Sequence, residues 1–144
     1  MSIRRHLASH DMIPATAHEA LDAGTVGAIV CDTSRIYDAN DHFLETVGYG
    51  RDELEAGELS WLRMTVPEFM AQDARAIAQL RTTGRADVYE KEFFHRDGTR
   101  MRVRLADLRL ELEPLRIFAF VAHAGNPAEV ALVDEIDAAT RPNT

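Results

Sequence analysis

The segment at residues 116–124 constrains the fold more than any other part of the sequence. Its residues, RIFAFVAHA, are apolar at both alternating sets of positions: Ile117, Ala119 and Val121 form one set, and Phe118, Phe120 and Ala122 form the other. Successive side chains of a strand point to opposite faces of a sheet. The segment therefore predicts a central strand that is covered on both faces.

A β-hairpin is predicted before this strand. Residues 88–95 and 101–112 flank Asp97-Gly98, a pair suited to the positive φ angles of tight hairpin turns. Arginines at positions 100, 102 and 104 alternate with apolar residues, so one face of the second strand carries a basic stripe. Glu90 and Glu92 on the neighbouring strand are expected to pair with this stripe, although it could otherwise receive an acidic partner or an anionic ligand.

The alternation changes phase further along the second strand of the hairpin. The leucines at positions 108, 110 and 112 have the opposite parity to Val103 and Leu105. A one-residue change of register moves a side chain to the other face of a sheet. We therefore predict a bulge near Ala106 and Asp107 that keeps the leucines turned inward.

The remaining elements precede and follow this hairpin. Short strands are predicted at 26–32 and 35–39, and Asn40 is placed to cap a helix over 41–47. Residues 51–64 have mixed helical character. Thr65 and Glu68 form a capping-box pattern for a longer helix over 66–82. Its predicted apolar stripe comprises Met70, Ala74, Ile77 and Ala78. With helical segments at both ends of the chain, the element order predicts an α+β fold, an antiparallel sheet with helices packed on one face.

Composition excludes several classes of function. The chain has 144 residues, enough for one domain, and a formal charge of −8, which argues against direct nucleic-acid binding. Cys31 is the single cysteine, so no intramolecular disulfide can form, as is typical of a reducing cytoplasm. The apolar stretches are too short to span a bilayer, and the N-terminal segment lacks the continuous apolar core of a secretory signal. We expect a cytoplasmic protein without a membrane contact.

Several local patterns occur in an order and at distances that resemble the PAS domain family of sensor modules. They are the strand RIYDAN ending at Asn40, the pair Gly48-Tyr49, Trp61 followed by TVPEF at 65–69, and YEKEFFHRDGT at 89–99. The resemblance implies a five-stranded antiparallel sheet in the order 2-1-5-4-3, with helices that enclose a small pocket against one sheet face. It divides the chain into an N-terminal helical flank at 1–25, a PAS domain at 26–125, and a short C-terminal helix and tail at 126–144.

The resemblance also implies sensing or partner contact rather than catalysis. We expect a sensor and dimerisation module of a bacterial signal transduction protein or transcription regulator, which binds a small molecule or a partner and relays a conformational change to an effector. Many PAS domains end in an Asp-Ile-Thr-like triplet, where this chain has His123-Ala124-Gly125. No effector pattern follows, so the chain is interpreted as a stand-alone sensor or as the input piece of a longer regulator.

The cofactor remains unassigned. Flavin-binding relatives use a cysteine in the helix after the second strand, where this chain has Asn40-Asp41-His42-Phe43, so Cys31 on the first strand is interpreted as a small buried residue. Haem-binding relatives carry a histidine on the long helix, and residues 66–82 contain none. His95 and His123 are poor substitutes on strands. His6 and His10, with Asp11 and His18 nearby, have a spacing that can chelate metal, but a solvated N-terminal segment is favoured and no metal site is assigned.

Two sets of residues are the candidate site. The predicted pocket wall comprises Phe43, Trp61, Leu62, Met70, Ile77, Val103 and Leu105. Trp61 and Tyr49 could flank a cofactor ring, although packing of the helices is the favoured role. The outer sheet face, with Phe118, Phe120 and Leu21, should not remain in water. A helix around Ala15 to Leu21, or a second subunit in a homodimer, is expected to cover it.

Two other functions remain open. One is a structural interaction domain of the same fold, whose cavity is filled by its own side chains and binds no ligand. The other is a small cone-shaped α+β enzyme, such as an isomerase. An enzyme would need a titratable group inside the pocket, and the core positions assigned from the sequence are apolar. We find no catalytic constellation in the sequence and rank the enzyme last.

Overall fold

The computed structural model describes residues 3–7 and 13–141. Its centre is a five-stranded antiparallel sheet in the order β2-β1-β5-β4-β3, as the resemblance implied. The strands are β1 (Gly27–Cys31), β2 (Ile36–Ala39), β3 (Tyr89–Phe94), β4 (Arg100–Glu111) and β5 (Arg116–His123). The two-sided apolar segment forms β5, the middle strand of the sheet, and its side chains are buried on both faces.

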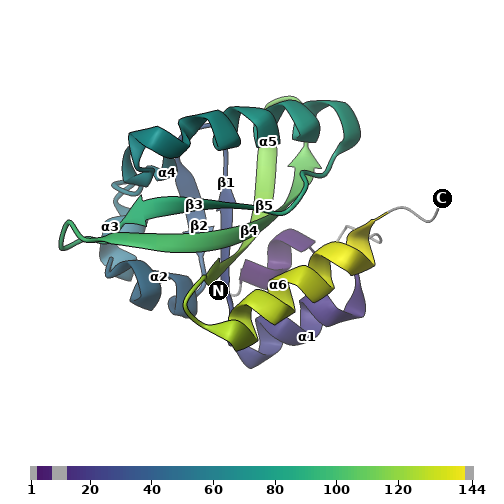
Figure 1. Cartoon of the computed structure of the whole chain (residues 1–144), viewed down its shortest axis with the longest axis horizontal. Coiled ribbons are helices and arrows are strands. Elements are labelled where there is room, and N and C mark those ends of the chain that lie inside the picture. Colours follow the sequence, from purple (N-terminus) through teal and green to yellow (C-terminus); the bar gives the residue numbers. More distant parts are fainter. Residues whose placement is uncertain (1–2, 8–12, 142–144) are drawn as a thin grey trace.

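Helices cover both faces of this sheet (Figure 1). The connection from β2 to β3 packs on the inner face, and it comprises α2 (Asp41–Val47), α3 (Arg51–Glu55), α4 (Trp61–Met64), the 3-10 turn η2 (Pro67–Phe69) and α5 (Met70–Thr83). The terminal segments pack on the outer face, and they comprise η1 (Ile3–Leu7), α1 (Ala15–Ala23) and α6 (Pro127–Thr140). The flanking helices therefore close a second core rather than extend away from the domain.

The cap of α2 follows the sequence prediction. Asn40 Oδ1 accepts hydrogen bonds from the backbone N–H groups of Phe43 and Ala28, both at 3.0 Å, and its amide donates to the Val26 carbonyl at 2.9 Å. The first contact satisfies an unpaired N–H at the helix start. The other two attach the start of α2 to β1 and to the residue just before it, so one side chain fixes both the helix and its place on the sheet.

The predicted bulge near Ala106 and Asp107 is wrong. β4 pairs with β5 in continuous register from Val103 to Arg109, and the irregularity lies between Arg109 and Glu111. Leu108 lies opposite Phe118 on the outer face, and Leu110 packs into the same outer core. The change of phase has a simpler cause: α6 covers this half of the outer face, so apolar residues are needed there and Asp107 is turned inward.

The predicted start of α5 and most of its buried face are also wrong, although Ile77 of the predicted stripe does face the sheet. Thr65 does not cap the helix, because its hydroxyl donates to the Trp61 carbonyl at 2.7 Å, and Glu68 pairs with Arg100. Met70, Ala74 and Ala78 are exposed, whereas the side chains that face the sheet are Asp73, Ala76, Ile77 and Leu80. The prediction chose the wrong face because the inner face contains Asp73. A search for apolar residues at helical spacing does not place an aspartate on the buried side.

Candidate functional site

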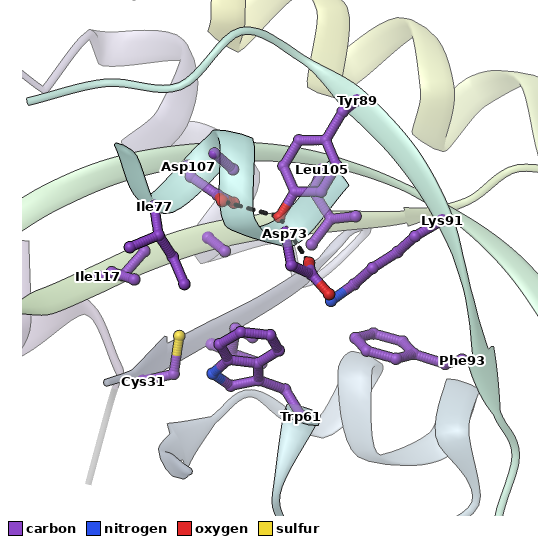
Figure 2. Close-up of a pocket in the computed structure, with 13 residues that line it drawn as sticks. Cys31, Trp61, Asp73, Ile77, Tyr89, Lys91, Phe93, Leu105, Asp107 and Ile117 are labelled. Carbon is purple, nitrogen blue, oxygen red and sulfur yellow. Dashed lines mark hydrogen bonds and ion pairs between the residues drawn. The ribbon is translucent and has the colours of Figure 1, made fainter. Parts of the chain in front are cut away.

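A small cavity lies between the inner sheet face and α5. The space that the centre of a water molecule can occupy in it is about 20 Å³, which is room for roughly one water. Figure 2 shows that polar side chains from both α5 and the sheet point into it, above Trp61 and Cys31. The lining residues are Ile29, Cys31, Trp61, Asp73, Ala76, Ile77, Tyr89, Lys91, Phe93, Leu105, Asp107, Ile117 and Ala119.

Strand alternation places three of the polar groups in this cavity. Tyr89, Lys91 and Phe93 share one parity on β3 and face inward, while the glutamates between them face outward and pair with arginines. Asp107 shares the inward parity of Leu105 on β4. The fourth polar group comes from the opposite wall, because Asp73 faces the sheet from the first turn of α5.

The chain's single lysine is buried at the edge of the cavity. Lys91 is 2% exposed, and its Nζ donates to Asp73 Oδ1 at 2.7 Å and to Thr65 Oγ1 at 3.0 Å. The same ammonium group lies 4.6 Å from the ring centroids of both Trp61 and Phe93. Burial lowers the pKa of Lys91, and the neighbouring Asp73 carboxylate partly opposes this shift. The ion pair and the two rings together compensate for removing the charge from water.

Tyr89 joins the two carboxylates. Its hydroxyl lies 3.1 Å from Asp107 Oδ2 and 3.4 Å from Asp73 Oδ1, and its single proton can serve one of them at a time. Burial raises the pKa of Asp107 to about 6, although Lys91 and the Tyr89 hydroxyl act to lower it. Burial likewise raises the pKa of Tyr89 well above its ordinary value. Asp107 thus changes charge close to neutral pH.

Two oxygen atoms of the cluster lack a partner. Asp73 Oδ2 and Asp107 Oδ1 are both buried and accept no hydrogen bond from any of the described residues. A buried acceptor without a donor costs roughly 1–3 kcal/mol, and more when it is charged. These two oxygens therefore lower the stability that the cluster contributes.

Cys31 behaves as the sequence predicted. It is buried, and burial raises the pKa of its thiol well above the ordinary value, so the thiol stays protonated at neutral pH. The side chain lines the cavity from β1. It contributes packing there, and it is not a reactive thiolate.

Comparison with known proteins now identifies the family. The sequence model of the PAS domain matches residues 25–122. The chain belongs to the PAS domain family. A relative, the hybrid signal transduction protein dokA of Dictyostelium discoideum, is 33% identical over 101 residues, which are 69% of this chain and 6% of dokA. This PAS domain thus matches a small part of a much longer signalling protein.

Solved structures share the fold of this PAS domain. The PAS domain of an HTR-like protein from Haloarcula marismortui is 26% identical, with a TM-score of 0.54 over 76% of this chain and 96% of that one. The PAS domain of a protein from Colwellia psychrerythraea is 16% identical, with a TM-score of 0.61 over 74% of this chain and 92% of that one. PAS domains are generally non-catalytic modules of signal transduction proteins.

The predicted pocket wall divides into three groups. Trp61, Ile77 and Leu105 line the cavity of the PAS domain. Phe43 and Val103 are buried in the same core but do not line the cavity. Leu62 and Met70 are 39% and 43% exposed, so their assignment to the wall is wrong. Met70 is exposed because α5 turns a different face to the sheet from the one predicted. Leu62 lies on the outward side of the single turn of α4, whose buried side presents Trp61 and Met64.

The polar cluster itself is missing from the sequence prediction. One signal for it was present, because Tyr89, Lys91 and Phe93 share a parity in a strand whose other parity carries glutamates. A lysine on an apolar face has to be buried or to disrupt that face. The statement that the core positions are apolar is therefore wrong for Asp73, Lys91 and Asp107. These titratable groups meet one requirement of an enzyme, but neither a nucleophile with its base nor an oxyanion site accompanies them among the lining residues.

The outer face differs from a free dimer surface. Phe118 and Phe120 are fully buried, with ring centroids 5.2 Å apart, in the second core formed with α1 and α6. Leu21 is partly buried against this core. Of the two covers expected from the sequence, the N-terminal helix is present, and α6 lies beside it (Figure 1). A subunit contact through these two phenylalanines is thus incompatible with this arrangement.

The other candidate residues lie away from the cavity. The basic stripe pairs with the neighbouring strand, as predicted, with Arg100 at 2.6 Å from Glu92 and Arg102 at 2.8 Å from Glu90. Tyr49 packs against the inner core without lining the cavity. His6 contacts Asp38 at 3.0 Å, whereas His10 and Asp11 lie outside the described residues. Within residues 3–7 and 13–141, no three His, Cys, Asp or Glu side chains are placed to hold a metal, and no helix is long and apolar enough to cross a membrane.

Proposed function

We propose that this PAS domain is the sensory input module of a bacterial-type signal transduction protein in the cytoplasm, and that its input acts at the cavity beneath α5. The effector is another domain or protein, and this module is not itself catalytic. The observation that carries the proposal is the buried polar cluster around a cavity of about 20 Å³. Perturbed titratable groups that converge on a cavity are typical of functional sites rather than of packing cores.

Stability alone does not account for this cluster. Replacing a buried ion pair by apolar residues of similar size is often neutral or stabilising. Here the pair is accompanied by Asp107, whose raised pKa reflects a cost of ionisation, and by two acceptors without donors. A residue set that costs stability in this way is expected where it serves binding or switching.

A physical connection leads from the cavity to α6. The carbonyl of Asp107 accepts from the N–H of Ala86 at 3.2 Å, in the segment that follows α5. The adjacent Arg85 forms a part-buried ion pair with Asp137 on α6. A change in the position of Asp107 or of α5 would therefore alter the anchor of α6. We propose that α6 carries the output.

The experiment compares amide hydrogen exchange in the wild type, in Asp107→Asn, which removes the cavity charge while keeping the side-chain size, and in Asp52→Asn, the same change at an exposed acid of α3. If the proposal is correct, Asp107→Asn changes protection along α6 while Asp52→Asn does not. Unchanged protection of α6 in Asp107→Asn would refute the relay. Native mass spectrometry and an absorption spectrum of the purified chain test for a co-purified ligand.

A ligand-free interaction domain is the second candidate, and the small size of the cavity favours it. Room for one water excludes an organic ligand unless α5 moves. If the chain is such a domain, we expect it to be isolated without a ligand. Substitutions in the cavity should then change its stability without changing amide hydrogen exchange along α6. We propose homodimerisation together with either function. Because Phe118 and Phe120 are buried within the chain, a dimer would use another surface or require displacement of α1 or α6.

A further inference from the structure

The two unpartnered oxygens and the cavity are complementary. Asp73 Oδ2 and Asp107 Oδ1 are buried acceptors on opposite walls, one on α5 and one on β4, and both carboxylates line the same cavity (Figure 2). Their other oxygens are both within reach of the Tyr89 hydroxyl, at 3.4 and 3.1 Å, so the two acids are close neighbours. A single donor of water size has room in about 20 Å³ and has two acceptors to satisfy.

The charges in the cavity select among such donors. The titratable groups that face Asp107 are Lys91 and Tyr89 from β3, Asp73 from α5 and Cys31 from β1. Tyr89 and Cys31 are neutral at neutral pH, because burial raises the pKa of each. With both acids ionised and Lys91 protonated, the cluster carries one net negative charge. A cationic donor both neutralises this charge and satisfies the oxygens, whereas water satisfies only the oxygens.

We propose that the cavity is a binding site for one water-sized cationic hydrogen-bond donor, an ammonium ion, which bridges Asp73 Oδ2 and Asp107 Oδ1. The site also has aromatic faces on one side, from Trp61 and Phe93, which already attract the ammonium group of Lys91 at 4.6 Å. Potassium has the same charge and a similar size but requires several oxygen ligands, which the largely apolar wall does not supply. Methylammonium has the same charge and too large a volume.

A proton competes for this site. Asp107 has its pKa raised to about 6, so acidification neutralises the cluster without a bound cation. Ammonium binding is therefore expected at pH 7.5 and lost at pH 5. This inference rests on the proposed function for its biological meaning, because it names the chemical class of the input.

The test measures the thermal midpoint of the full chain at pH 7.5 in ammonium chloride, potassium chloride or methylammonium chloride at equal ionic strength. Ammonium is expected to raise the midpoint by about 2–4 °C over potassium at a concentration several times the dissociation constant, and methylammonium is expected to have no such effect. The rise should disappear at pH 5 and in Asp107→Asn, and it should persist in Asp52→Asn.

Equal midpoints in ammonium and potassium would overturn the proposal, as would an equal rise in Asp107→Asn and the wild type, which would indicate a non-specific salt effect. Should Asp107→Asn fail to fold, ¹⁵N-labelled ammonium replaces it as the test on the wild type: the expected result is a slowly exchanging ammonium signal with nuclear Overhauser contacts to Ile77 or Ile117, and its absence overturns the proposal. If ammonium binds but amide hydrogen exchange along α6 does not change, the ammonium site is supported and the proposed relay from the cavity to α6 is refuted.

Discussion

At the scale of single residues, Lys91 and Asp107 set the charge of the cavity in this PAS domain. Lys91 is buried against Asp73, Trp61 and Phe93, an environment in which a lysine is retained only with a partner for its charge. Asp107 lies across the cavity without a full set of donors. One acid is thus neutralised by the lysine, and the other titrates near neutral pH.

Removal of the Lys91 charge should be costly. Lys91→Met leaves the Asp73 carboxylate buried without a cation, and we expect the free energy of unfolding to fall by about 3–5 kcal/mol. Arg102→Met is the matched control, because it removes the cation of an exposed pair with Glu90 and should cost less than about 1 kcal/mol. Urea unfolding measures both. Equal losses in the two variants would contradict the buried pair.

The double variant Lys91→Met with Asp73→Leu separates a charge effect from a size effect. Because it removes both members of the pair and leaves no buried charge between them, it should recover most of the stability lost in Lys91→Met. If it is as unstable as the single variant, packing of the lysine stem rather than its charge supports the core.

The pH dependence of stability should report on Asp107. Its pKa is raised from 3.8 to about 6 in the folded protein, so the native state holds this proton more tightly than the unfolded state does. Its contribution to stability is fully present below pH 3.8 and is lost as the pH rises to about 6. This loss is on the order of 3 kcal/mol.

Asp107→Asn removes this dependence. The difference in unfolding free energy between Asp107→Asn and the wild type should therefore shift in favour of the variant by about that amount between pH 4 and pH 7 in potassium buffer. Urea unfolding as a function of pH measures it, with Asp52→Asn as the control for a general charge effect. A difference that stays constant with pH would show that Asp107 is not the titrating group.

At the scale of elements, the decisive feature is which side of α5 and β4 faces the cavity. Leu80 is fully buried one turn after Ala76 and Ile77, whereas Met70 at the start of the helix is exposed. On β4, continuous register with β5 places Asp107 inward and Leu108 outward. Asp107 thus faces the core that α5 closes, and Leu108 faces the core that α6 closes.

The orientation of α5 predicts unequal effects of two truncations. Leu80→Ala removes a buried side chain and should lower the unfolding free energy by about 2–5 kcal/mol. Met70→Ala removes an exposed one and should change it by less than about 0.5 kcal/mol. Denaturant unfolding of the two variants measures this contrast. A larger loss for Met70→Ala would restore the apolar stripe expected from the sequence.

At the scale of the whole molecule, one sheet serves two cores. The inner core holds the polar cavity, and the outer core is closed by η1, α1 and α6 (Figure 1). Segments that are far apart in the sequence meet on the outer face, where Ala17 and Ala20 of α1 and Val133 and Ile136 of α6 are all buried. The flanks are therefore part of the folded unit.

Deletion of residues 1–23 should open the outer core. Loss of Ile3, Leu7, Ala17 and Ala20 uncovers apolar surface next to Phe118 and Phe120, and we expect self-association or aggregation of the shortened chain. Light scattering, with the full chain in the same buffer as the reference, measures the particle mass. A shortened chain with the mass of a soluble monomer, identical in behaviour to the full chain, would contradict this role.

The sequence by itself determined the central strand, the hairpin and the cap of α2, and its resemblance to the PAS family implied the strand order. Alternation in β5, the Asp97-Gly98 pair and the Asn40 cap are properties of neighbouring residues, and the central strand, the hairpin and the capped helix are present, although only Gly98 of the pair has a positive φ. The pairing of Arg100 and Arg102 with glutamates of the neighbouring strand was also predictable, because opposite charges commonly pair across strands.

Only the tertiary structure decided which face each residue occupies and that Asp73, Lys91 and Asp107 meet at a cavity inside the inner core. Periodicity shows that two sets of side chains differ, but not which of them meets a second layer. Lys91 can be buried only because Asp73, 18 residues away on another element, supplies its counter-charge. Such a pair exists once α5 is packed on the sheet, so the cavity's chemistry follows from packing between distant segments and not from local pattern.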